Sequence, residues 1–165
     1  MSIQIVPIQH TYAAPVIELV LTIQQEEFNI PVTIKDQPDL LKINKFYYRD
    51  GGCFWGAFIN GKLVGTIGLT KFDHHQGAIR KFFVRESYRG KELDIAQMLL
   101  ETLITYAHEN GIKELYLGAL NTMKAALRFF ERNHFIVTEQ AALPKAFPLT
   151  MIDDIFLHFT LNQAG

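Results

Sequence analysis

The sequence is poor in cysteine, in long apolar runs and in basic charge, and each shortage excludes a class of protein. Cys53 is the only cysteine among the 165 residues, so no disulfide can form within the chain and a reducing compartment is the simpler interpretation. No stretch approaches the roughly 18 apolar residues of a transmembrane helix, and the first ten residues lack the basic and apolar regions of a secretory signal. We therefore expect a cytoplasmic protein that has no membrane partner.

The charges are balanced, with 16 Lys and Arg against 17 Asp and Glu and a formal net charge of -1. A general nucleic-acid binder usually carries a basic excess, so no nucleic-acid partner is expected. His74 and His75 are adjacent in a predicted turn, where neighbouring side chains rarely chelate one ion, and we expect no metal. The hydrophobic share of 48% is ordinary for a globular chain. Without repeats or linkers, residues 1–165 are expected to form a single domain.

The first half of the chain predicts a helix followed by a β-rich region. Apolar residues between positions 3 and 8 indicate a short strand, and a helical pattern covers residues 12–28, with a loop and a short helix after it. Two β-rich runs, CFWGAFI and KLVGTIGLT, flank Asn60-Gly61, which supplies the positive φ angles of a tight hairpin turn. A further strand, QGAIRKFFV, follows.

The second half predicts alternating helices and strands. Apolar residues recur at i, i+3 and i+4 spacing from Ile95 to Ala107, which indicates a helix, and Asn110-Gly111 is a typical end for it. A strand KELYLGAL, a helix around residues 123–130, and two last strands, HFIVTE and MIDDIFLHFTL, complete the chain. This order predicts an α/β fold of the α+β type, with a mixed sheet of about seven strands and helices on both faces.

The junction FFVRESYRGKELDIAQMLL is the most informative stretch. It passes from a strand through a polar loop containing Arg89, Gly90 and Lys91 into the start of a helix. Free N–H groups and the helix dipole favour an anion at such a junction, and the two cations suit a pyrophosphate. A strand-loop-helix unit with a basic loop that binds no phosphate is the other interpretation, and spacing alone does not exclude it.

This junction resembles the acyl-CoA-binding motif of the GNAT family of N-acetyltransferases, Gln/Arg-x-x-Gly-x-Gly/Ala followed by x-x-Leu-Leu. Alignment on Leu99-Leu100 places Lys91 at the first position, Asp94 at the glycine and Ala96 at the final small residue. The segment GIKELYLGALNTMKAALRFFERNHF resembles the family's later strand, helix and FYEKNGF segment. The resemblance covers about residues 3–161 and implies a GNAT-like fold with a mostly antiparallel central sheet.

The resemblance implies an N-acetyltransferase that passes an acetyl group from acetyl-CoA, the acyl-donor substrate, to a primary amine by direct attack in a ternary complex. The acceptor would be a small-molecule or protein amine. The strand main chain would pair with the pantetheine arm, and the loop and helix start would hold the pyrophosphate. The cofactor-binding residues implied are Phe82, Phe83, Val84, Arg89, Gly90, Lys91, Glu92, Leu93, Asp94, Ile95 and Ala96.

Three positions depart from the family pattern. A carboxylate at Asp94, beside a pyrophosphate, costs on the order of 1–4 kcal/mol at contact distance. Asp94 and Gln97 also resemble a capping box, which would occupy the same amides. Phe130 replaces the tyrosine that usually returns a proton to the thiolate, so the usual general acid is absent. His134 stands at the glycine of NGF, where we expect a turn that tolerates positive φ.

The catalytic residues stay open at this point. Glu114 and Tyr116 are candidates, because the family sometimes places a base or an acid on the strand before the last helix. The departures also favour two other interpretations, a catalytically impaired acyl-CoA-binding or interaction module and a structural domain that has lost the cofactor. An exposed last strand, MIDDIFLHFTL, could pair across a homodimer.

Overall fold

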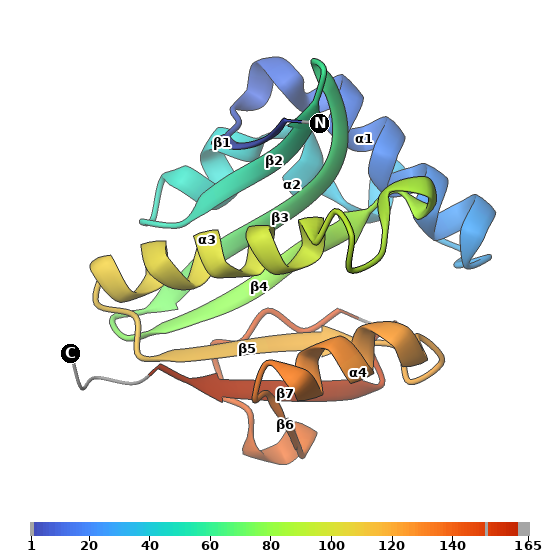
Figure 1. The fold of residues 1–165 in the computed structure, drawn as a ribbon. Helices are drawn as coiled ribbons and strands as arrows, with labels where there is room; N and C mark the ends of the chain where they lie inside the picture. Colours follow the sequence, from blue (N-terminus) through green and yellow to red (C-terminus); the bar gives the residue numbers. More distant parts are fainter. Residues whose placement is uncertain (1, 151, 162–165) are drawn as a thin grey trace.

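The computed structural model describes residues 2–150 and 152–161, which form an open sheet of seven strands (Figure 1). The strand order is β1-β2-β3-β4-β5-β7-β6, and the β4–β5 pair is parallel whereas the other pairs are antiparallel. The predicted mixed, mostly antiparallel sheet is therefore confirmed. The strands are β1 (Ile3–Pro7), β2 (Cys53–Ile59), β3 (Lys62–Asp73), β4 (Gln76–Val84), β5 (Glu114–Ala119), β6 (Ile136–Thr138) and β7 (Ile155–Thr160).

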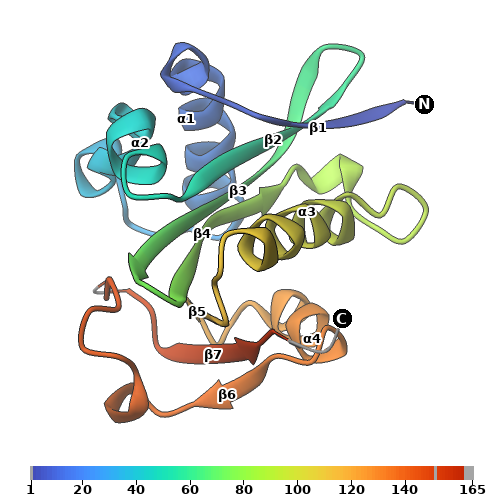
Figure 2. The ribbon, with the colours of Figure 1, turned by 90° about the vertical axis from the view of Figure 1, so that its left-hand side faces the viewer.

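Helices cover both faces of the sheet, as predicted. Figure 2 shows α1 (Ala13–Leu21) and α2 (Pro38–Leu41) on one face, and α3 (Ile95–Glu109) and α4 (Lys124–Arg132) on the other. Wider, π-helical turns extend the first face at Thr22–Glu27 and Asn44–Tyr48. Short 3-10 turns lie at His10–Tyr12, Ile34–Asp36, Glu86–Tyr88 and Gln140–Ala142. In the part of the chain that the structure describes, no helix is long and apolar enough to cross a bilayer.

Each face has its own apolar core. Helix α3 buries Leu99, Leu100 and Leu103 completely against the sheet. On the opposite face, Val16 and Leu19 of α1 are also fully buried, in a separate cluster. The sheet is therefore packed on both faces, and helices on both sides hold the strands that form a site.

Local conformations at two turns agree with the sequence. Asn60 and Gly61 have φ angles of 52° and 78°, which is the positive-φ pair of the predicted tight hairpin between β2 and β3. His134, at the end of α4, has a φ of 70°. The N–H groups of His134 and Phe135 donate to the carbonyls of Glu131 and Phe130, both at 3.0 Å. This is a Schellman end, which explains why related sequences place glycine at this position.

The predicted exposed last strand is wrong. Strand β7 pairs with β5 along its whole length and with β6 over residues 156–158, so β6 takes the edge of the sheet. The chain reverses after β6, and β7 then lies between β5 and β6. No local pattern in the sequence indicates this order. The strand begins at Ile155, and Met151, included in the prediction, lies outside the described residues. A homodimer stays a prediction, without this strand as its basis.

Truncation of the α3 core is expected to destabilise the fold. Leu103→Ala removes a side chain with 0% exposure, and the free energy of unfolding is expected to fall by about 2–5 kcal/mol. Leu41→Ala, at a leucine with 47% exposure, is the matched control and is expected to cost roughly 0.5 kcal/mol. Urea unfolding measures both, and equal losses would contradict the assigned core.

Candidate active site

Strands β4 and β5 separate after a short paired stretch, and this separation creates the site. Residues 76–78 of β4 pair with residues 114–116 of β5. Figure 1 shows the two strands diverging beyond that point. Residues 79–84 therefore keep main-chain groups on the β5 side that no β5 residue satisfies. The resemblance assigns the pantetheine arm to residues 82–84 of this stretch.

A β-bulge in β4 bends the strand away from β5. The register with β3 shifts between the pairs Thr66–Phe83 and Gly68–Arg80, so one residue of β3 faces two residues of β4. Lys81, in the bulge, has a φ of 53°. The fully buried Thr66 hydroxyl donates to the Lys81 carbonyl oxygen at 2.8 Å, which satisfies an acceptor that the irregular ladder leaves open.

The bulge also turns two consecutive cations to the same face of the sheet. Side chains alternate along a regular strand. Ile79 and Phe82 both pack in the core beneath α3 and α4, and the Phe82 ring lies 5.8 Å from that of Phe130. The two residues between them, Arg80 and Lys81, therefore both point to the face that carries α1 and α2.

A cavity of about 160 Å³ lies between the diverging strands. Gln24 and Ile30 line it from one face of the sheet, and Met123 and Phe130 line it from the other. Loop residues just before β7 close its remaining side. Residues from both faces of the sheet thus line the same cavity. Its charged lining residues are Arg80, Lys81 and Asp153.

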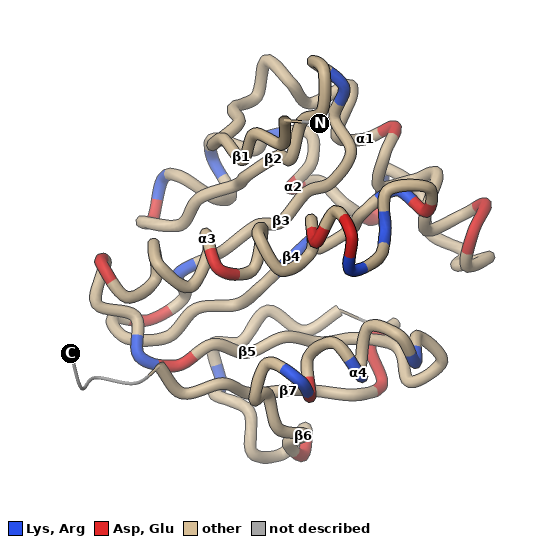
Figure 3. Tube along the Cα trace, in the orientation of Figure 1, with Lys and Arg blue, Asp and Glu red and all other residues tan. Residues whose placement is uncertain are grey.

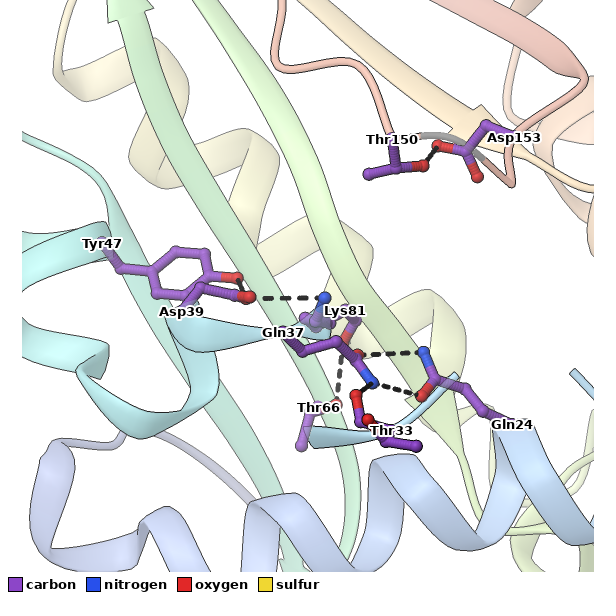
Figure 4. A network of polar contacts seen from close by, with 9 residues as sticks. All are labelled: Gln24, Thr33, Gln37, Asp39, Tyr47, Thr66, Lys81, Thr150 and Asp153. Carbon is purple, nitrogen blue, oxygen red and sulfur yellow. Dashed lines mark hydrogen bonds and ion pairs between the residues drawn. The ribbon is translucent and has the colours of Figure 1, made fainter. Parts of the chain in front are cut away.

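Lys81 is held by a buried carboxylate (Figure 4). Its Nζ lies 3.5 Å from Asp39 Oδ2, and both side chains are nearly buried. The Tyr47 hydroxyl donates to the same oxygen at 2.5 Å. Burial lowers the pKa of Lys81, and the charge of Asp39 partly opposes that shift. Desolvation and the neighbouring carboxylate together raise the pKa of Tyr47 well above its ordinary value, so Tyr47 stays a proton donor to Asp39.

Asp153 faces the cavity from the opposite wall (Figure 4). Thr150 Oγ1 donates to Asp153 Oδ2 at 2.6 Å. The carboxylate lies directly over Gly118, where a Cβ would come within 2.4 Å of Oδ2, so only glycine leaves room for it. Burial raises the pKa of Asp153, and the Thr150 hydrogen bond and the charges of Arg80 and Lys81 reduce that rise. A half-buried carboxyl that lines a cavity is a candidate to accept a proton from a bound substrate.

The predicted phosphate loop lies at the end of β4 and leads into α3. Both acidic and basic residues lie along it (Figure 3). Gly90 has a φ of 118° and Asp94 a φ of 57°, so the loop turns twice through left-handed conformations. The Asp94 N–H donates to the Gly90 carbonyl oxygen at 3.0 Å. This hydrogen bond closes a turn directly before α3, and a pyrophosphate at the helix start stays a prediction.

The predicted capping box at Asp94 is wrong. Asp94 is the N-cap of α3, but its side chain makes no capping hydrogen bond, because a left-handed φ turns it away from the first helical amides. Gln97 instead donates to Glu101 and Asn133, at 2.8 and 2.9 Å. The helix start therefore keeps its amides available to an anion. The left-handed conformation also explains the glycine that the family motif has here.

The other residues predicted to bind the cofactor have mixed surroundings. Phe82 and Phe83 line the cavity, and Val84 is buried. The Arg89 guanidinium forms a two-pronged ion pair with Glu27, and its Nε donates to the Val84 carbonyl oxygen at 2.7 Å. It thereby ties the loop to the end of the first helical segment. Lys91 and Glu92 are exposed, Leu93 and Ala96 are half-buried, and Ile95 is buried in the core. Contact of this set with acetyl-CoA stays a prediction.

Phe130 is a core residue that also lines the cavity. It has 5% exposure and packs against the rings of Phe82, Phe129 and Phe135. None of the described residues that line the cavity is a tyrosine. The structure thus offers no phenolic proton donor in the described cavity wall.

The two candidate catalytic residues on β5 lie away from the cavity. The Glu114 carboxylate pairs with His158 and accepts a hydrogen bond from the Thr160 hydroxyl at 2.8 Å. The Tyr116 ring has 8% exposure and stacks on His158 at 4.4 Å. Both occupy the half of β5 that pairs with β4, whereas the cavity is lined by the following residues, from Leu117 onward. A role for either in proton transfer has no support from this geometry.

Three charged cavity residues were not predicted from the sequence. Arg80 and Lys81 interrupt an apolar strand, and two cations in a strand buried on both faces are a signal that could have been used. Asp153 carries no such signal, because a long loop brings it to the cavity.

A splayed mixed sheet, with a cavity between the splayed strands and an open helix start beside it, is the architecture of an acyl-CoA N-acyltransferase. The model of the acetyltransferase (GNAT) family matches residues 17–135. The chain therefore belongs to the GNAT family of acetyltransferases.

Individual relatives agree with this assignment. A GNAT-family acetyltransferase from Staphylococcus aureus Mu50 is 36% identical with a TM-score of 0.94, over 98% of this chain and 100% of that one. The PaiA N-acetyltransferase of Thermoplasma acidophilum, solved in complex with coenzyme A, shares the fold at 18% identity and a TM-score of 0.78, over 98% of this chain and 100% of that one. A Xenopus tropicalis protein, "Probable N-acetyltransferase camello", is 34% identical over 64% of this chain and 49% of its own length. The chain thus spans about half of that relative.

Neutralising Asp94 is expected to strengthen acetyl-CoA binding. Asp94→Asn removes the charge beside the predicted phosphate site and keeps a residue type that tolerates left-handed φ. At a few ångströms in water one such charge is worth about 1 kcal/mol, or about fivefold in the dissociation constant. Isothermal titration at low and high salt measures the gain, which should shrink as salt screens the charge. Asp94→Gly should show the same gain, and an unchanged affinity in both variants would place the phosphates elsewhere.

Asp153 is expected to make stability fall as pH rises. Its pKa in the folded chain is raised above the ordinary value of 3.8, so between these two values the folded state holds more protons than the unfolded state. The free energy of unfolding therefore decreases as pH rises from about 4 through the folded-state pKa. Asp153→Asn lacks this contribution, so the wild-type stability minus that of the variant should decrease over this window in urea titrations. A difference that increases with pH would contradict the raised pKa, and near-UV circular dichroism at pH 7 checks that both proteins are folded alike.

Proposed function

We propose that the protein transfers an acetyl group from acetyl-CoA to a primary amine, within the cavity between β4 and β5. The observation that carries this proposal is the unpaired stretch of β4 beside a cavity that holds one carboxylate, Asp153. Residues 82–84 offer main-chain groups to the pantetheine arm, and residues 91–96 offer helix-start amides to the pyrophosphate. The family assignment supports this acyl donor, and the acceptor is an amine of a small molecule or a protein.

Groups in the cavity serve the deprotonation of the amine and the polarisation of the thioester. The amine enters as an ammonium, binds beside Asp153 and loses a proton to this carboxylate. The nitrogen lone pair attacks the thioester carbonyl carbon, whose oxygen is polarised by a main-chain N–H of β4. The nitrogen of the tetrahedral intermediate gives its second proton to solvent, the carbon–sulfur bond breaks, and the thiolate leaves and takes a proton from solvent. Lys81 and Arg80 place positive charge along the same wall. Holding both reactants in line supplies much of the rate gain.

We also infer a cytoplasmic location from the single, buried thiol of Cys53. A small cavity favours a small acceptor, or the end of an extended protein segment, over a folded surface.

Acetyl-CoA is expected to stabilise the protein and to be turned over. At a concentration of about a hundred times its dissociation constant it adds ~2.7 kcal/mol, which for a domain of this size raises Tm by about 5–10 °C. Thiol release with a panel of amines then measures transfer, and Asp153→Asn is expected to lower kcat/KM by about 10²–10⁴-fold. In the wild type kcat/KM should rise with pH as Asp153 ionises, and the variant should lack this limb. No shift of Tm at millimolar acetyl-CoA would refute the proposal.

A second candidate, an acyl-CoA-binding module with impaired catalysis, is favoured by Phe130 at the usual tyrosine position. Phe130→Tyr distinguishes the two. If thiolate protonation limits the rate, a hydroxyl at this cavity wall is expected to raise kcat by about 10²-fold or more. Single-turnover kinetics measures the step directly. Phe129→Tyr, on the same helix but outside the cavity lining, is the control. An unchanged rate in Phe130→Tyr would show that solvent protonates the thiolate fast enough.

A further inference from the structure

Arg80 differs from the other cations that follow it along β4 and the next loop. Residues 80–89 contain four, namely Arg80, Lys81, Arg85 and Arg89. Lys81 pairs with Asp39, Arg85 with Glu18 and Arg89 with Glu27. Within residues 2–150 and 152–161, Arg80 has no carboxylate within 4 Å. It nevertheless lines the cavity and is half-buried.

The bulge makes this arrangement possible. Without the extra residue, the side chain after Arg80 would point to the α3 face and Lys81 could not reach Asp39. With it, Lys81 is neutralised by a nearly buried carboxylate, and the neighbouring Arg80 keeps its charge for the cavity. Removing the guanidinium of a half-buried arginine from water is costly unless an anion forms an ion pair with it. Its planar fork of donors matches a carboxylate, which it can bind through two parallel hydrogen bonds.

The carboxylate of Asp153 lines the same cavity as Arg80. Asp153 is positioned by Thr150 and by the absence of a side chain at Gly118. The charge of Arg80 acts on Asp153, yet the two groups form no ion pair within 4 Å. The cavity therefore presents a cation and an anion that are close but separate.

We propose that the acceptor is a free α-amino acid, whose carboxylate is bound by Arg80 and whose amino group is bound by Asp153. This rests on the proposed transfer to an amine and names the class of amine. An acceptor with positive charges only, such as a polyamine, would be repelled by the unpaired guanidinium. A peptide N-terminus carries a neutral amide where an amino acid carries the carboxylate. A cavity of about 160 Å³ is of the order that admits a benzene-sized molecule, which suits a small amino acid.

Matched acceptors test the carboxylate. Thiol release from acetyl-CoA is measured with the twenty L-amino acids, with their decarboxylated amines where these exist, and with amino-acid amides. We expect the preferred amino acid to exceed its decarboxylated partner and its amide by about 10- to 100-fold in kcat/KM, the range of a charge-assisted hydrogen bond. A decarboxylated amine or an amide that reacts as fast as the amino acid would overturn the proposal.

Variants test Arg80. Arg80→Met is expected to raise the amino-acid KM by about 10- to 100-fold, with the acetyl-CoA KM unchanged and a much smaller change in the rate with decarboxylated amines. Arg80→Lys should restore part of the loss, because it restores the charge without the fork. Arg49→Met, which removes an exposed guanidinium outside the cavity, is the matched control. Equal losses for amino acids and decarboxylated amines in Arg80→Met would assign Arg80 a structural role instead.

Direct binding separates this proposal from the proposed function. If acetyl-CoA binds but no acceptor is acetylated, titration of the amino-acid panel into the CoA-saturated protein decides. Binding that Arg80→Met weakens supports the acceptor class, and no binding overturns it. If acetyl-CoA fails to bind, the acetyltransferase function fails, and the same titration on the protein alone still decides whether the cavity takes amino acids.

Discussion

One extra residue in β4, at Lys81, controls the site. The bulge bends β4 away from β5, frees the main chain of residues 79–84 on that side and turns Arg80 and Lys81 to one face. A left-handed lysine costs about 1–2 kcal/mol. It persists because the Thr66 hydroxyl binds its carbonyl and Asp39 binds its ammonium. Strain at a position held by buried partners is typical of a functional site.

The cavity is lined from both faces of the sheet, and the two faces carry different groups. The α3 and α4 side carries an open helix start and apolar walls, which suit a long cofactor with a pyrophosphate. The α1 and α2 side carries the buried network of Asp39, Tyr47 and Lys81, together with the carboxylate of Asp153. In the proposed reaction the donor and the acceptor would approach from opposite faces, and neither would need to displace the other.

Much of the fold could be predicted from local patterns. Asn60-Gly61 predicted its hairpin because positive φ is favoured at both residues, and the apolar spacing of α3 predicted a helix that buries Leu99 and Leu103. The position of β7 could not be predicted, because pairing partners distant in sequence decide which strand lies at the edge. The Asp94 cap failed because aspartate suits both an N-cap and a left-handed turn. At the site, the motif predicted a loop between β4 and α3, which the structure contains, and its contact with acetyl-CoA stays a prediction. The charges of the cavity depend on a bulge and on a long loop, which no residue spacing reveals.

Amide hydrogen exchange with and without acetyl-CoA tests most directly whether the separated part of β4 binds the acyl donor. Slower exchange is expected for the β4 amides of residues 79–84 that do not pair with β3, and for the first amides of α3, because bound acetyl-CoA would pair with both. Amides of β1 and β2, remote from the cavity, should not change. If saturating acetyl-CoA protects other segments and leaves β4 unchanged, the gap between β4 and β5 is not the binding site.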